Sequence, residues 1–153
     1  MQQTRRTVLL TAAAALFAPA AACAAQAREI TVYKTPWCGC CGGWVKHLQA
    51  AGFKTQVVEV QDLAPIRAKH GVPFELSSCH TGVAGGYVFE GHVPVADVER
   101  VLKEKPKALG LTVPGMPIGS PGMEVPGAAP EAFDTLLLLR DGTTRVFARH
   151  GAA

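Results

Sequence analysis

Residues 29–51 read EITVYKTPWCGCCGGWVKHLQAA, and this stretch decides the local fold. Ile30 and Val32 share one face of an extended segment, which predicts a short strand over residues 29–33 that the Lys-Thr-Pro sequence at 34–36 ends. A helix is expected to begin around Cys40 or Cys41 and to stop just before Gly52. Its apolar residues recur at helical spacing: Trp44, Val45, Leu48 and Ala51. A cysteine-rich loop therefore joins a strand to a helix.

The rest of the chain continues this alternation of strands and helices. The predicted elements are a strand at 54–60, a helix at 63–70, a glycine-rich turn at 82–86, a strand at 87–89, a helix at 94–104, and a hairpin of strands 135–139 and 144–148 around Asp141-Gly142. Residues 109–130 are so rich in proline and glycine that no regular element is expected there, and loops of this length are usually functional or disordered. The pattern predicts an α/β protein.

Length and composition indicate one folded domain. The chain has 153 residues, of which 48% are apolar and 18% charged. Its formal net charge is +3, and loss of the first 27 residues with Arg5 and Arg6 would lower it to +1. This balance argues against nucleic acid or another polyanion as a partner.

Residues 1–27 have the features of an export signal that is later removed. Two arginines precede an apolar run from Val8 to Phe17, and small residues up to Ala27 offer a cleavage site. The run is too short to span a bilayer, and no other segment of the sequence comes close to doing so, so no membrane attachment is expected after cleavage. Arg5-Arg6 fits either a twin-arginine signal or an ordinary secretory start. Lipidation at Cys23 is the less favoured alternative. We expect a periplasmic domain over residues 28–153.

Four cysteines then remain, and three of them are crowded at Cys38, Cys40 and Cys41. Cys38 and Cys41 form a Cys-x-x-Cys pair at a helix start, where the helix dipole and free amides stabilise a thiolate. Such a pair closes a disulfide when oxidised, and up to this point the motif resembles a thioredoxin active site. Cys40 is the departure, because a third thiol competes with a simple dithiol exchange. Three neighbouring thiolates are suited to bridging several Cu(I) ions, since soft sulfur ligands select Cu(I). A plain thiol exchanger, a zinc site and structural thiols remain open alternatives.

The proline- and glycine-rich loop supports the copper interpretation. Met116 and Met123 both lie in PGMPIGSPGM, residues 114–123, where no helix or strand face requires them for packing. A thioether is a soft ligand that never needs to lose a proton. Cys79-His80, in a serine-rich turn, could add a sulfur and an imidazole. The other histidines are weaker candidates: His92 could face the site, His47 is as easily solvated as ligating, and His70 and His150 are expected at the surface.

The motifs together resemble the CopG-type periplasmic copper-resistance proteins, often catalogued only as a domain of unknown function. The resemblance rests on WCGCCGGW at 37–44, SCHT at 78–81, GHVP at 91–94 and VPGMPIGSPGME at 113–124. It implies a thioredoxin-like fold with a central mixed sheet flanked by helices and a long Gly/Pro/Met loop. It also implies cysteine-bridged copper and a role in copper redox interconversion.

Three functional hypotheses follow. The first is a periplasmic Cu(I)-binding protein of copper resistance, with a multinuclear cluster held by Cys38, Cys40 and Cys41 and closed by Cys79, His80, Met116 and Met123. Its partners would be copper ions and other periplasmic copper-handling proteins. The second is a thiol-disulfide oxidoreductase with Cys38 as nucleophile and Cys41 as the resolving thiol. The third is a zinc-binding or structural module.

Overall fold

The computed structural model describes residues 28–151. The export-signal prediction for residues 1–27, including Cys23, lies outside this range. Among the described residues, no helix has the length and apolar character needed to cross a membrane.

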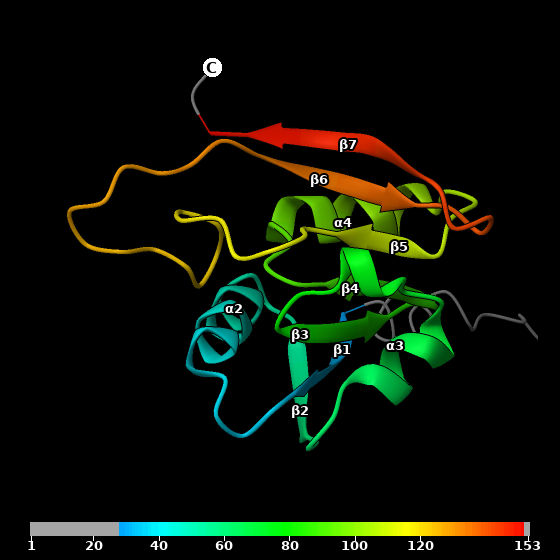
Figure 1. The fold of residues 1–153 in the computed structure, drawn as a ribbon, viewed down its shortest axis with the longest axis horizontal. Coiled ribbons are helices and arrows are strands. Elements are labelled where there is room, and N and C mark those ends of the chain that lie inside the picture. Colours follow the sequence, from blue (N-terminus) through cyan, green and yellow to red (C-terminus); the bar gives the residue numbers. More distant parts are fainter. Residues whose placement is uncertain (1–27, 152–153) are drawn as a thin grey trace, which may run out of the picture.

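A seven-stranded sheet runs through the described part of the chain, in the order β2-β1-β3-β4-β5-β6-β7 (Figure 1). The strands are β1 (Glu29–Lys34), β2 (Lys54–Glu59), β3 (His80–Ala84), β4 (Tyr87–Glu90), β5 (Gly110–Thr112), β6 (Phe133–Leu138) and β7 (Thr144–His150). β1 pairs with β2, and β4 with β5, in parallel, whereas the other neighbours are antiparallel. The predicted mixed sheet is therefore confirmed.

Three α-helices accompany the sheet over residues 28–151. They are α2 (Gly39–Ala50), α3 (Ala64–His70) and α4 (Val95–Glu104), with one 3-10 turn, η1 (Phe74–Leu76). All three α-helices were predicted, and their ends differ by only one or two residues. Gly71 ends α3 in the left-handed conformation, at φ 71°, which glycine adopts without steric cost. The predicted α/β class is confirmed.

Alternating side chains place apolar residues on both faces of the sheet. Phe89 packs into the larger core with Trp44 of α2 and Val98 of α4. Its neighbour Val88 points the other way, into a smaller cluster with Val72 just after α3. α2 and α4 thus share one face, while α3 lies on the other.

One predicted turn is wrong. Residues 82–86 were assigned to a glycine-rich turn, but β3 runs to Ala84 and only Gly85 and Gly86 turn the chain. Gly82 is needed for packing instead: a Cβ there would lie 2.8 Å from Cη2 of Trp44. The absent side chain lets the indole pack directly against the strand.

The proline- and glycine-rich loop contains one strand that the sequence did not predict. It was expected to hold no regular element, yet β5 lies at its start, between β4 and β6. Leu111 is fully buried there, so pairing on both sides and core packing override the unfavourable composition. The remainder of the segment is irregular, as predicted.

The C-terminal hairpin was predicted, but the surface position of His150 was wrong. Its Nε2 atom lies 2.9 Å from a carboxylate oxygen of the buried Asp97 on α4 and 2.9 Å from the Thr135 hydroxyl. Its ring also stacks on Phe133. His150 therefore joins the hairpin to α4.

Candidate metal centre

Strand pairing explains why residues far apart in sequence meet at one end of the sheet. Lys34 at the end of β1 pairs with His80 at the start of β3, in antiparallel register. Thr81 likewise pairs with Glu90 at the end of β4. The segment after β1, the residue before β3 and the segment after β4 consequently lie side by side.

The Cys-x-Cys-Cys motif occupies the first turn of α2. Cys38 is the N-cap residue and has no side-chain capping hydrogen bond. A disulfide joins Cys38 to Cys41, whose Cα atoms are 5.6 Å apart. Cys41 is fully buried, while Cys38 and Cys40 are partly exposed. The redox pair anticipated from the sequence is therefore closed in this structure.

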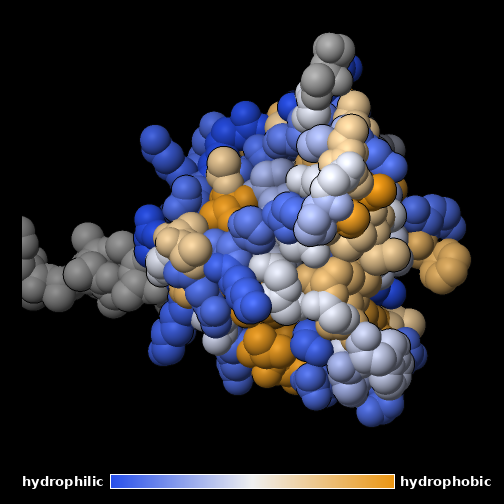
Figure 2. Space-filling view, turned by 90° about the vertical axis from the view of Figure 1, so that its left-hand side faces the viewer, coloured by the Kyte–Doolittle hydropathy of each residue, from blue (hydrophilic) through white to orange (hydrophobic). Residues whose placement is uncertain are grey.

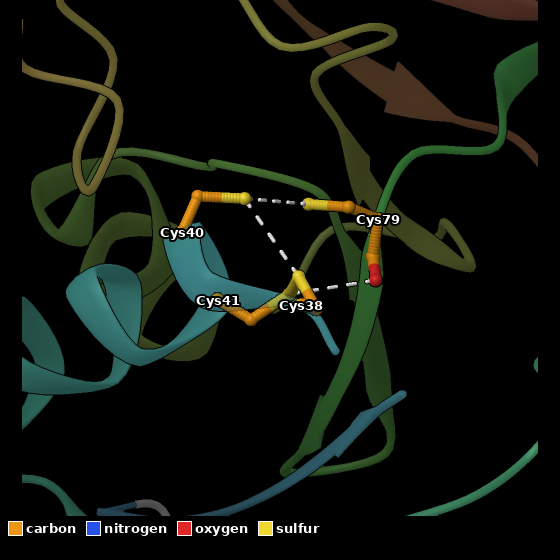
Figure 3. Close-up of side chains that lie close together, drawn as sticks. All are labelled: Cys38, Cys40, Cys41 and Cys79. Carbon is orange, nitrogen blue, oxygen red and sulfur yellow. Dashed lines mark hydrogen bonds between the residues drawn. A yellow bond between two sulfur atoms is a disulfide. The ribbon is translucent and has the colours of Figure 1, made fainter. Parts of the chain in front are cut away.

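Cys79 brings a fourth sulfur to the motif, as Figure 3 shows. The Cys40 thiol lies 3.7 Å from Cys38 Sγ and 3.8 Å from Cys79 Sγ. Cys41 Sγ is 3.5 Å from the Cys79 carbonyl oxygen. The four sulfur atoms all lie within 4.8 Å of one another. Burial, together with the neighbouring Cys40, raises the pKa of the Cys79 thiol to about 12. Cys79 is therefore a protonated thiol at neutral pH in the metal-free protein.

Two buried imidazoles lie on the inner side of Cys79. His92 Nε2 is 3.0 Å and His80 Nδ1 is 3.3 Å from Cys79 Sγ, and these atoms form a second compact group of metal-binding type. Burial lowers the pKa of His92, and burial with the proximity of His92 lowers the pKa of His80 to about 3. Both rings are neutral at physiological pH, the form in which imidazole binds a metal.

His92 is held by the proline- and glycine-rich loop. Its Nδ1–H donates to the Pro121 carbonyl, 2.8 Å away, so the Nε2 lone pair faces Cys79. Gly122 then packs backbone to backbone on α2, since a Cβ at Gly43 would lie 2.7 Å from the Gly122 Cα. The sequence indicated that His92 could face the site but did not include it among the candidate ligands.

The two loop methionines occupy different positions. Met116 lines the same surface pocket as Cys38, Cys40 and Cys79, and 52% of its surface is exposed. Met123 is not part of that pocket lining, and its backbone closes a turn with Ser120. Met116 is thus the methionine that can approach the sulfur cluster from outside. The face of the molecule that carries α2 and the loop shows apolar patches among hydrophilic residues (Figure 2).

His47 lies outside both clusters. Its Nε2 is 2.7 Å from a carboxylate oxygen of Glu124, and its side chain is half-exposed. This contact joins α2 to the loop just after Met123. Of the two roles that the sequence left open for His47, solvated residue or metal ligand, its position outside both clusters favours the solvated one.

The site as a whole brings soft sulfur atoms and neutral imidazole nitrogens close enough together to bind metal, in two groups that share Cys79. With the Cys38–Cys41 disulfide closed, two thiols remain, Cys40 and Cys79. Reduction would make four sulfurs available beside the two imidazoles. These features define an α/β protein with a cysteine cluster capable of binding metal.

Comparison with known proteins agrees with this description. Residues 76–123 match a family described as protein of unknown function, DUF411. The solved structure titled copper resistance protein copG, form 2, is 43% identical, with a TM-score of 0.75, and the match covers 80% of this chain and 97% of that one. Form 1 of the same title is 42% identical, with a TM-score of 0.76, covering 81% and 98%. No curated protein matches the chain. The chain belongs to the CopG family of copper-resistance proteins.

Proposed function

We propose that the protein binds Cu(I) in the periplasm, as a multinuclear cluster bridged by Cys38, Cys40, Cys41 and Cys79, and that it serves copper resistance. The carrying observation is the convergence of four cysteine sulfurs within 4.8 Å. Thiolates are the soft ligands that select Cu(I), and sulfurs this close can each bridge two ions. The titles of the related structures support copper as the metal.

Three further groups lie next to the four cysteines, and we propose that they close the cluster. His80 and His92 approach Cys79 from the core side, and Met116 lies on the solvent side. Met123 remains a candidate from the sequence. Neutral imidazole and thioether add ligands without adding negative charge.

The disulfide supplies a route to copper redox interconversion. Oxidation of the Cys38 and Cys41 thiols forms one disulfide and releases two electrons and two protons. Those electrons reduce two Cu(II) ions to Cu(I). The disulfide leaves only Cys40 and Cys79 as thiols, so the oxidised site holds Cu(I) weakly and can release it. Regeneration then requires an external dithiol or another reductant of that class.

Thiol-disulfide exchange is the alternative function, and the closed Cys38–Cys41 pair at a helix start favours it. The order β2-β1-β3-β4, with α2 after β1 and α4 after β4, supports a thioredoxin-like core for this part of the chain. Under this alternative Cys40 has no required role.

Under the copper proposal, the partners would be other copper-handling proteins of the periplasm.

Anaerobic titration of the reduced protein with Cu(I), followed by desalting and metal analysis, tests the proposal. A Cys23→Ser background restricts the count to the four cluster cysteines. We expect more than one copper per chain, and little copper in a control sample whose Cys38–Cys41 disulfide has been verified as closed. Saturation at one copper, or a preference for zinc, would contradict the proposed cluster.

A further inference from the structure

An ion pair between Arg67 and Glu90 lies beside the cysteine cluster, and Arg67 lines the same pocket as Cys40 and Cys79. The Glu90 side chain at the end of β4 is completely buried, and the Arg67 side chain of α3 is 17% exposed. Arg67 Nε donates to Glu90 Oε1 over 2.9 Å. The Thr81 hydroxyl donates to the other carboxylate oxygen over 2.6 Å. Each carboxylate oxygen of Glu90 is therefore engaged.

The ion pair also holds both backbone polar groups of Ser78, the residue before Cys79. The Ser78 N–H donates to Glu90 Oε1 over 2.7 Å, and Arg67 Nη2 donates to the Ser78 carbonyl. Ser78 lies between η1 and β3, where no neighbouring strand pairs with it. A backbone segment of this kind needs side-chain partners, and here Arg67 and Glu90 supply them.

Ser78 carries the constraint onward to the Met116 loop. Its hydroxyl donates to the Gly115 carbonyl, one residue before Met116. Its side chain also packs against Gly91, where a Cβ would lie 2.7 Å from Ser78 Oγ. One residue thus connects the ion pair, the Cys79 backbone and the loop that reaches the pocket.

Stability alone is a weak reason for this arrangement. Burying two charges costs desolvation energy, and well-packed apolar residues often serve stability as well or better. A buried pair does impose one geometry, because each partner must stay hydrogen-bonded. The geometry imposed here is that of the segment entering Cys79.

We propose that Arg67 and Glu90 are positioning residues of the metal centre: they fix the Ser78 backbone and thereby hold the Cys79 sulfur opposite Cys40. Their role in metal binding rests on the proposed copper function. Their effect on the distance between the Cys40 and Cys79 thiols is independent of that function, and it can be measured without metal.

The first experiment uses the metal-free, Cys23→Ser protein with the Cys38–Cys41 disulfide closed. A short bifunctional thiol reagent, fluorescent only after both of its arms have reacted, bridges Cys40 and Cys79. In Glu90→Gln the amide cannot accept from three donors as the carboxylate does. We expect the ratio of bridged to singly labelled protein to fall about tenfold, the factor typical of losing a hydrogen bond to a charged group.

Two further variants separate positioning from general destabilisation and from charge. Asp97→Asn removes another buried carboxylate, one that pairs with His150 away from the cluster, and should lower the melting temperature without changing the bridging ratio. Arg67→Lys keeps the positive charge but loses the fork that reaches both Glu90 and the Ser78 carbonyl, so bridging should fall. Arg67→Lys also decides the question if Glu90→Gln does not fold.

Copper titration gives the second readout. If Glu90 acts through Cys79, Cys79→Ser and the Glu90→Gln/Cys79→Ser double variant should bind equal amounts of Cu(I). Normal bridging in folded Glu90→Gln and Arg67→Lys, or an equal loss in Asp97→Asn, would overturn the positioning role. Additive losses of copper would do the same. Absence of copper binding in every variant would instead contradict the proposed function, while the bridging ratios still decide the positioning.

Discussion

His92 and Cys79 are in direct contact on the inner side of the site, with His92 Nε2 3.0 Å from Cys79 Sγ. The opposite ring nitrogen of His92 donates to the Pro121 carbonyl, which directs the Nε2 lone pair toward the sulfur. In the metal-free protein the Cys79 thiol donates to this lone pair, in keeping with its raised pKa. Metal binding would displace that proton and leave both atoms as ligands.

His92→Gln should therefore weaken copper retention. Glutamine can still donate to the Pro121 carbonyl, but its amide is a poor ligand for Cu(I). Competition of the loaded protein against a Cu(I) chelator measures the effect. His47→Gln is the matched control, because His47 pairs with Glu124 outside both clusters. Equal retention in both variants would exclude His92 as a ligand.

Cys40→Ser separates the copper proposal from thiol exchange. The variant keeps the Cys38–Cys41 pair but removes the sulfur that lies within 4 Å of both Cys38 and Cys79. We expect the copper count per chain to collapse while reductase activity toward a disulfide substrate is kept or improved, since a competing thiol is gone. Parent-like copper binding would contradict the proposed core of the cluster.

Met116→Leu and Met123→Leu should behave differently. A Met-to-Leu exchange costs less than about 1.5 kcal/mol in a packed core, so both variants should fold. Only Met116 lines the pocket with the cysteines, and only its replacement is expected to speed copper loss to a chelator. Thermal unfolding of both metal-free variants provides the control. Faster loss from Met123→Leu alone would reverse the assignment.

Acid should destabilise the metal-free protein through His80. Its pKa falls from 6.5 in the unfolded chain to about 3 in the fold, because the ring is buried. The unfolded state therefore binds the proton first, and stability present above about pH 6.5 is lost as the pH falls toward 3. We expect His80 alone to account for a loss of about 2 kcal/mol between about pH 7 and about pH 5.

Urea unfolding at the two pH values measures this loss in the parent and in His80→Leu. For each protein, the unfolding free energy at about pH 5 is subtracted from that at about pH 7. This subtraction cancels the part of the cost of the substitution that does not depend on pH. The difference should be smaller in the variant, which has no ring to protonate. An equal pH dependence would show that other groups are responsible.

Local patterns in the sequence were sufficient for most of the elements. The helix from Gly39 follows from apolar spacing, and the C-terminal hairpin follows from Asp141-Gly142. The turn assigned to residues 82–86 failed because Gly82 and Gly85 look alike in sequence. One admits the Trp44 indole and the other turns the chain, and only packing distinguishes these roles.

The sequence by itself determined that three thiols are crowded at a helix start, since Cys38, Cys40 and Cys41 are separated by at most three positions. Tertiary structure decided which distant residues join them. Antiparallel pairing of β3 with β1 and β4 brings Cys79 and His92 to the motif, and the Gly43–Gly122 contact brings in the loop. Strand register and close backbone packing depend on the whole core, so no local pattern encodes them. The spacing of residues 38–41 could therefore predict a thiol cluster, but the burial of His92 against Cys79 and the Arg67–Glu90 pair that holds Ser78 became visible only in the fold.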